Sequence, residues 1–217
     1  MDSAITMHSA FDPATVKFSS IAKTSKGGKI VYLNFPNSQR IVLQTPPMSA
    51  PFGISSYDDA SDGKRSYSLD ASFKGCDTNA KLESFLGKCR AFDDIIIDTA
   101  TENAKAWFGK DMSREMTAML FRKSVRDPAD PKYAPTLRLK ITPNTEYYDE
   151  HQNRVDMDYI IKGTSFRAIV ELSSVFFVSK QFGVTWRIVQ LAVQSRPDRL
   201  SGFAFQGDEE GESAAMQ

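Results

Sequence analysis

The sequence predicts a mainly β (α+β) fold in which five or six strands close into a small barrel. Three observations lead to this prediction. Runs of alternating apolar and polar residues recur along the chain, as is typical of half-buried strands. One run, 164–178, is too long for one flat strand and is expected to bend around the corner of a barrel. A single long stretch with apolar residues three or four apart predicts one amphipathic helix among the strands.

The first three strands are expected in the N-terminal third, after a flexible segment at 1–22. The β-branched and aromatic run 30–35 predicts a strand, and 40–45 is expected to return as its hairpin partner. Three prolines make 45–55 a long loop, because proline cannot donate to a strand ladder. The run 64–73 alternates cleanly and predicts the third strand.

The helical period begins after this strand and continues from 77 to 110. Asp77 or Asn79 is expected to cap the helix at its N-terminus, and Gly109 lies near its end. A second, shorter helix is expected at 113–121. The chain therefore inserts a helical part between its third and fourth strands.

Three further strands are expected at 135–142, 164–178 and 183–195. In the first, aliphatic residues alternate with Arg138 and Lys140, which must point away from the core. In the last, Trp186, Ile188, Gln190 and Ala192 are expected on one face, and Arg187, Val189, Leu191 and Val193 on the other. A five-stranded barrel with a helix after its third strand is the arrangement of an OB-fold.

The length of 217 residues suits one domain with flexible ends. We expect an OB-fold domain at 23–197, with its helical insertion at 77–125, and a disordered acidic tail at 198–217. The net charge is zero, but the last ten residues hold four acids and no base. The preceding residues carry 27 bases against 23 acids, and this asymmetry suggests a polyanionic partner.

Composition also indicates the compartment. The two cysteines, Cys76 and Cys89, are expected to be free thiols, because a secreted scaffold normally has more. No apolar run is long enough for a membrane span, and the N-terminus lacks the pattern of a signal peptide. The sequence predicts an intracellular protein that is not secreted.

Catalytic and metal-binding patterns are weak. The two histidines, His8 and His151, are too few for a histidine-based metal site. Asp93, Asp94 and Asp98 could be metal ligands, but on a helix such carboxylates more often form a solvated face. We therefore expect no enzyme activity, no metal and no cofactor.

What remains is a binding surface of bases and aromatic rings. Cations neutralise phosphates, and flat rings stack on unpaired bases, so this mixture suits single-stranded nucleic acid. Rings on strands such as Tyr32, Phe177 and Trp186 could equally be core, and outward bases could be merely solvated. The candidate DNA-binding residues are Arg40, Lys64, Arg65, Tyr133, Arg138, Lys140, Arg167, Lys180, Phe182, Trp186 and Arg187. Arg122, Lys123, Arg126 and Lys132 could form a second basic patch.

Several segments are similar to the single-stranded DNA-binding proteins of large nucleo-cytoplasmic DNA viruses, relatives of the single-stranded DNA-binding protein of short-tailed coliphages. These segments are Lys29-Ile-Val-Tyr-Leu-Asn-Phe, Tyr133-Ala-Pro-Thr-Leu-Arg-Leu-Lys-Ile, Ile161-Lys-Gly-Thr-Ser-Phe-Arg-Ala, Val175-Phe-Phe-Val and Phe182-Gly-Val-Thr-Trp-Arg. The resemblance covers about residues 25–196 and is strongest after 131.

The resemblance implies an OB-fold that coats single-stranded DNA without sequence preference during viral replication, recombination and repair, often as a homodimer. It also implies that an acidic C-terminal tail occupies the DNA groove and recruits a polymerase or helicase. The tail residues that fit are Asp208, Glu209, Glu210 and Glu212. Two alternatives stay open at this point: a virion or scaffold protein that makes only protein contacts, and an RNA-binding module.

Overall fold

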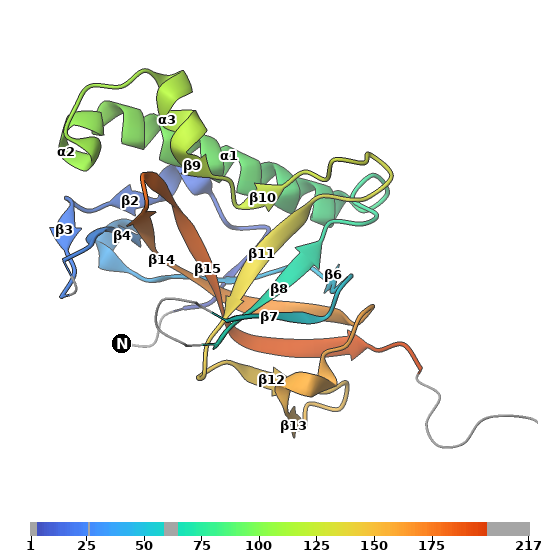
Figure 1. Cartoon of the computed structure of the whole chain (residues 1–217). Coiled ribbons are helices and arrows are strands. Elements are labelled where there is room, and N and C mark those ends of the chain that lie inside the picture. The colour runs from blue at the N-terminus through green and yellow to red at the C-terminus, as the bar shows by residue number, and fades with distance from the viewer. Residues whose placement is uncertain (1–3, 26, 59–64, 199–217) are drawn as a thin grey trace, which may run out of the picture.

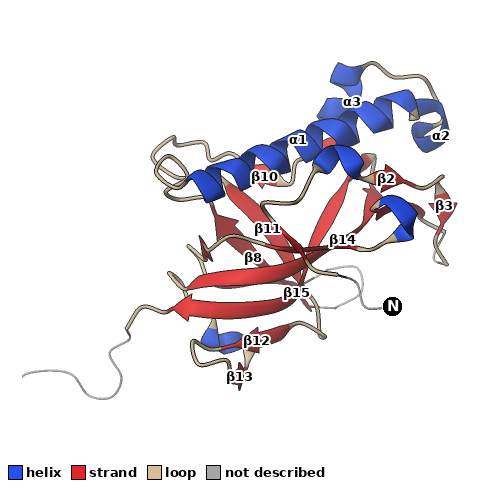
Figure 2. Ribbon diagram, turned by 180° about the vertical axis from the view of Figure 1, so that it is seen from behind, coloured by secondary structure: helices blue, strands red, loops and turns tan. Residues whose placement is uncertain are grey.

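The computed structural model describes residues 4–25, 27–58 and 65–198. Within these ranges the chain forms one large, strongly twisted sheet and three α-helices. The helices lie together at one end of the sheet, and β12 and β13 lie at the opposite end (Figures 1 and 2). The mainly β class that the sequence predicts is therefore confirmed.

Along the chain, short N-terminal strands precede the helices, and the two longest strands come last. The N-terminal elements are β1 (Thr6–Met7), η1 (Pro13–Thr15), β2 (Lys17–Phe18), β3 (Ala22–Lys23), β4 (Lys29–Asn34), η2 (Pro36–Ser38), β5 (Ile41–Gln44), β6 (Met48–Ser49), β7 (Ile54–Asp58) and β8 (Arg65–Ser72). The helices are α1 (Ala80–Glu102), α2 (Ala104–Phe108) and α3 (Arg114–Leu120). The C-terminal elements are β9 (Phe121–Arg122), β10 (Val125–Arg126), β11 (Thr136–Ile141), β12 (Glu146–Tyr148), β13 (Arg154–Val155), η3 (Met157–Tyr159), β14 (Ser165–Val178) and β15 (Gln181–Ser195).

Five strands pair in a closed circuit. β14 pairs with β6, β6 with β8, β8 with β11, β11 with β15, and β15 pairs again with β14. All of these pairings are antiparallel except that of β11 with β15, which is parallel. The long β14–β15 hairpin therefore closes the circuit, because β14 pairs with β6 and β15 pairs with β11. The remaining strands extend the sheet outward from these five.

The predicted hairpin of 30–35 with 40–45 is wrong. Both strands form, as β4 and β5, but each pairs with β14 instead of with the other. β5 pairs with Ile169–Leu172 and β4 pairs with Ser174–Phe176, and a register shift lies between these stretches. Because β14 is irregular at that point, its two halves accept two different partners.

The predicted long helix forms as two helices separated at Asn103. Asn79 caps α1 as expected, because its Oδ1 accepts hydrogen bonds from the backbone N–H groups of Lys81 and Leu82 at 3.1 and 3.3 Å. Gly109 ends α2 in a left-handed conformation with a φ of 81°. The shorter predicted helix is α3, with Ser113 as its N-cap.

The hydrophobic core lies between α1 and the sheet. Phe85 and Phe92 of α1 both meet the ring of Trp186 edge-on, with centroids 6.2 Å apart in each pair. The N-terminal segment also joins this core, because Phe11 and Val16 are 1% and 5% exposed. The described part of 1–22, expected to be flexible, therefore contributes side chains to the core.

The predicted faces of 183–195 are correct only for the first half of β15. Trp186 and Ile188 are buried, but so are Leu191 and Val193, which belong to the opposite parity. Val189 has no partner on β14, since Ile169 pairs with Gln190 and Val170 with Ile188. This extra residue is a bulge, and it exchanges the inner and outer faces of the strand beyond it.

Two carboxylate contacts attach other elements to α1. Asp93 is buried, and its Oδ2 accepts hydrogen bonds from the backbone N–H groups of Ser124 and Val125. Burial raises the pKa of Asp93 to about 6. Asp94 and Asp98 both form surface ion pairs with the guanidinium group of Arg114, which attaches α3 to α1.

Candidate nucleic-acid interface

The interface is organised around β11, where buried and exposed side chains alternate. Leu137, Leu139 and Ile141 face the core, whereas Arg138 and Lys140 are exposed. The outward direction that the alternation predicts for both bases is confirmed. The outer face of β11 therefore carries two cations, and strand pairing decides which side chains lie beside them.

Strand register aligns Lys140 with a basic residue of the neighbouring strand. Lys140 lies opposite Arg187 of β15 and opposite Ser68 of β8. Arg187 in turn lies opposite Glu171 of β14. Opposite residues of paired strands point to the same side of a sheet, so these side chains form one row across four strands.

Two arginines from short strands extend this row toward the helices. Arg126 of β10 lies opposite Thr136, two residues before Arg138, and Arg122 of β9 lies opposite Gly183. Burial and the nearby guanidinium of Arg138 lower the pKa of Arg126, and Arg122 adds to this effect. We name the five cations the basic face: Arg122, Arg126, Arg138, Lys140 and Arg187.

Two carboxylates hold arginines of the basic face in place. Asp70 accepts two hydrogen bonds from Arg138, from Nε and from Nη2, each at 2.8 Å. Hydrogen bonding to Asp70 raises the pKa of Arg138. Glu171 is ion-paired with Arg187. The five cations and these two carboxylates together carry a net charge of +3.

Paired arginines still have donors for a phosphate. A guanidinium has five N–H groups, and the contact with Asp70 uses only two groups of Arg138. The side chains of Arg138 and Arg187 remain 44% and 43% exposed. The carboxylates therefore orient the guanidinium groups without covering them.

Two exposed aromatic rings lie on the outer side of the sheet, the side that carries the basic face. Tyr32 of β4 is opposite Ser174 and is 50% exposed, and Tyr57 of β7 is 69% exposed. Tyr57 is two residues from Ser55, which pairs with Ser68 of the row. Rings thus lie toward both sides of the basic face, on β7 and on β4.

Phe176 is a half-buried ring next to the basic face. It lies opposite Gly183, where a Cβ atom would come 3.0 Å from the Phe176 ring and 3.1 Å from the Arg122 carbonyl oxygen. A glycine is needed at this position because Phe176 and the backbone of Arg122 both approach the strand closely.

Two rings predicted to contact DNA are unavailable. Phe182 and Trp186 are 0% and 1% exposed. Both lie on the inner side of β15, where Phe182 packs among Trp107, Phe108 and Phe121, and Trp186 packs against α1. Neither ring can stack on a base while the core is intact, so both are core residues.

The other predicted contact residues are exposed but do not belong to the row. Arg65 is ion-paired with Asp58 and lies on the opposite parity of β8 from Ser68. Tyr133 is 61% exposed, with Lys132 Nζ 4.9 Å from its ring centroid. The remaining predicted positions are Arg40 before β5, Lys180 in the β14–β15 turn and Arg167 of β14. Lys64, Asp208, Glu209, Glu210 and Glu212 lie outside the described residues.

Sequence reasoning did not select Tyr57 or Phe176. Tyr57 follows a proline-rich loop, and no sequence pattern marks its segment as a strand; only the pairing with β8 identifies it as one. Phe176 and Phe177 are adjacent, and the bulge after Leu172 decides which of them faces outward. Alternation alone could have indicated that one ring of the pair is external.

Two negative findings concern only the part of the chain that the structure describes. Its histidine, cysteine, aspartate and glutamate residues form no group of three that could hold a metal ion. None of its helices combines the length and the hydropathy needed to span a bilayer.

Comparison with known proteins identifies a family but no activity. The model of a family of unknown function, DUF5871, matches residues 70–205, which is more than half of the chain. An uncharacterized protein of Acanthamoeba polyphaga mimivirus, L291, is 24% identical over 164 residues. That stretch is 70% of this chain and 26% of the relative, so the chain spans about a quarter of the relative's length.

Two solved structures show weak similarity. The single-stranded DNA-binding protein from bacteriophage Enc34 has a TM-score of 0.45 at 9% identity, covering 88% of this chain and 96% of its own. The single-stranded DNA-binding protein gp2.5 encoded by bacteriophage T7 has a TM-score of 0.48 at 11% identity, covering 81% and 100%. Similarities at this level support no conclusion about fold or function.

Proposed function

The chain belongs to this family of unknown function, DUF5871, and we propose that it binds single-stranded DNA through the basic face. The observation that carries the proposal is the register of β11 with β15, which places Lys140 beside Arg187 and next to Arg138. The resemblance of its sequence segments to viral single-stranded DNA-binding proteins supports the same function.

Two kinds of contact on this face favour a single strand of DNA. The net charge of +3 on the basic face attracts a phosphate backbone and releases its counterions. Tyr32 and Tyr57 offer ring faces to unpaired bases, and stacking of this kind does not depend on base identity. A duplex hides its base faces, so only an unpaired strand could use both contacts.

We extend the proposal to the architecture and the biological process. The closed circuit of strands is an OB-type barrel, and the protein coats unpaired strands in viral DNA replication, recombination and repair, without catalysis. It acts as a homodimer at intracellular replication sites, where the acidic tail contacts a polymerase or helicase. These points follow from the sequence resemblance and are separate from the binding test below.

Fluorescence anisotropy with labelled oligo-dT and a matched duplex tests the binding proposal. We expect tighter binding to oligo-dT, and weaker binding after Lys140→Gln, because Lys140 is exposed and its loss leaves no buried carboxylate unpaired. Lys105→Gln on α2 is the matched control, because it removes an exposed lysine that belongs to a helix and not to a strand of the sheet. Equal affinity for duplex, or equal loss in both variants, would contradict the proposal.

Arg138 needs a different substitution. Arg138→Gln alone would leave Asp70, whose side chain is only 12% exposed, without its partner. The double variant Arg138→Gln with Asp70→Asn removes both charges and keeps hydrogen-bonding groups at both positions. A folded double variant with full affinity would exclude Arg138 from the interface. A matched RNA oligomer in the same assay shows whether the chain distinguishes DNA from RNA.

A further inference from the structure

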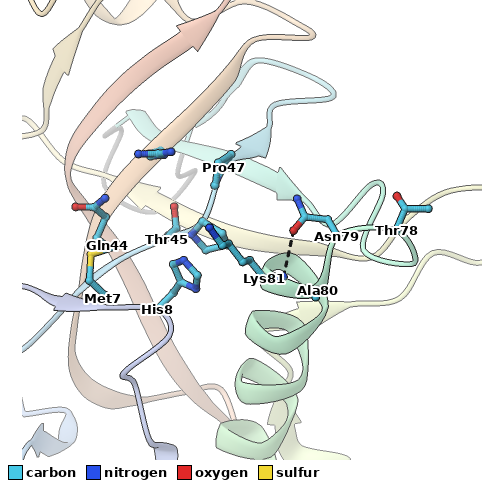
Figure 3. A pocket seen from close by; sticks show the side chains of 11 residues that line it. Met7, His8, Gln44, Thr45, Pro47, Thr78, Asn79, Ala80 and Lys81 are labelled. Carbon is cyan, nitrogen blue, oxygen red and sulfur yellow. Dashed lines mark hydrogen bonds between the residues drawn. The ribbon is translucent and has the colours of Figure 1, made fainter.

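A hollow of about 830 Å³ lies at the N-terminus of α1 (Figure 3). Its walls come from the turn after β1, the end of β5, the loop that follows β5, and the first turn of α1. Arg167 of β14 also lines it. Segments far apart in the sequence therefore meet around one open space.

The charges around this hollow are positive. Lys81 and Arg167 line it, both are exposed, and neither is ion-paired within the described ranges. No carboxylate is among the lining residues. The N-terminus of the 23-residue helix α1 adds its partial positive charge, although Asn79 already binds two of its backbone N–H groups.

His8 is the second observation that points to a ligand. It is only 8% exposed, and its ring projects into the hollow beside Lys81 (Figure 3). Its backbone is fixed, because its N–H donates to the Gln44 carbonyl at 2.9 Å and its carbonyl accepts from Lys88 Nζ at 3.1 Å. The ring nitrogens have no hydrogen-bond partner in the described part of the chain.

Burial and the neighbouring positive charges both affect the pKa of His8. Burial lowers the pKa of His8, and the positive charges of Lys88 and Lys81 on α1 and of Arg167 on β14 lower it further. On its other side Arg167 borders a second hollow, where Asp149 and Glu150 lie. At neutral pH the ring is therefore uncharged and has one N–H to donate.

We propose that this hollow binds a phosphate group, held by Lys81, Arg167, the ring of His8 and the N-terminus of α1. A buried donor, two cations and a helix end converge on one space, and each of them favours an oxyanion. The inference does not depend on DNA binding by the basic face. The phosphate could belong to a polynucleotide backbone or to a free nucleotide, and the experiment separates these sources.

Histidine NMR of the full-length protein tests the proposal, because the chain has only two histidines. His151 is exposed in a turn and is the internal control. We expect inorganic phosphate to shift the His8 ring signals saturably and to raise the pKa of His8, because a bound anion stabilises its protonated form. His151 should respond only as it does to sodium chloride at the same ionic strength.

Substitutions make the result specific to this hollow. Arg167→Gln should abolish the saturable shift of His8, and Lys81→Gln is the second variant if the first does not fold. Lys140→Gln on the basic face should leave the shift unchanged, so failure of this site and failure of DNA binding are distinguishable. No saturable shift of His8, or the same shift in the Arg167 and Lys81 variants, would overturn the proposal.

Two further titrations identify the source of the phosphate. Oligo-dT without a terminal phosphate carries only backbone phosphates, whereas a nucleoside monophosphate carries only a terminal one. A saturable His8 shift with the oligonucleotide supports a backbone ligand, and a shift with the monophosphate alone supports a free nucleotide. A response to neither, with none to inorganic phosphate, refutes the site.

Discussion

The salt dependence of binding gives the sharpest test of the basic face, because its charges can be changed one at a time. For a single strand, log Kobs falls with log salt with a slope of about −0.7 for each neutralised phosphate. The net charge of +3 then predicts a slope of about −2, or a roughly twentyfold loss of affinity between about 50 and 200 mM salt.

Two substitutions should move this slope in opposite directions. Lys140→Gln removes one positive charge, so the slope should become about −1.4, a roughly sevenfold loss over the same range. Glu171→Gln removes the carboxylate that pairs with Arg187 and leaves an amide oxygen that can still accept its hydrogen bond. Its slope should steepen to about −2.8, a roughly fiftyfold loss.

Anisotropy titrations with labelled oligo-dT at several salt concentrations measure these slopes. Lys105→Gln should retain the slope of the unmodified chain. Equal changes of slope in Lys140→Gln and Lys105→Gln, or a shallower slope in Glu171→Gln, would refute phosphate binding by the basic face. A slope near zero for the unmodified chain would exclude phosphate contacts altogether.

Three other predictions follow from stability, stacking and the tail. The native state binds the Asp93 proton more tightly than the unfolded chain does, so the contribution of Asp93 to the free energy of unfolding falls as pH rises from about 4 to 6. The Asp93→Asn variant has no such carboxyl group, so its free energy of unfolding should rise by about 3 kcal/mol relative to that of the unmodified chain across this window. Urea titrations at several pH values measure this difference, and a difference that does not change with pH would contradict the raised pKa. Tyr32→Ala and Tyr57→Ala should each cost about 1–3 kcal/mol of binding free energy to oligo-dT with little change in salt slope, whereas a changed slope and unchanged affinity would argue against stacking. Deletion of 206–217 removes four acids and should strengthen binding in the same assay if the tail competes with phosphate for the cations, as the sequence resemblance implies; unchanged affinity would reject that competition.

Local chemistry explains what could be predicted from the sequence. The alternation of aliphatic residues with Arg138 and Lys140 depends only on strand geometry, and both side chains are exposed as expected. The cap at Asn79 and the stop at Gly109 are likewise local, and both occur in the structure. Such features need no knowledge of distant strands.

Features that depend on pairing between distant segments could not be predicted. The proximity of Lys140 and Arg187 requires the parallel register of β11 with β15, which no local pattern encodes. The ion pairs of Arg138 with Asp70 and of Arg187 with Glu171 have the same origin. The sequence makes Trp186 a candidate stacking ring, because strand periodicity does not say which face of β15 is covered by α1.

The bulge at Val189 also constrains how the length of β15 can change. It allows Trp186 and Leu191, on opposite parities, to be buried by one continuous strand. Deletion of this one residue would remove the bulge and leave Ile188, Gln190 and Leu191 in regular inward–outward–inward alternation, in the pairing with β14 that they already have. Val189 should therefore tolerate both substitution and the loss of one residue better than the paired positions of β15 do, and deletions within this strand in related chains should fall at the bulge.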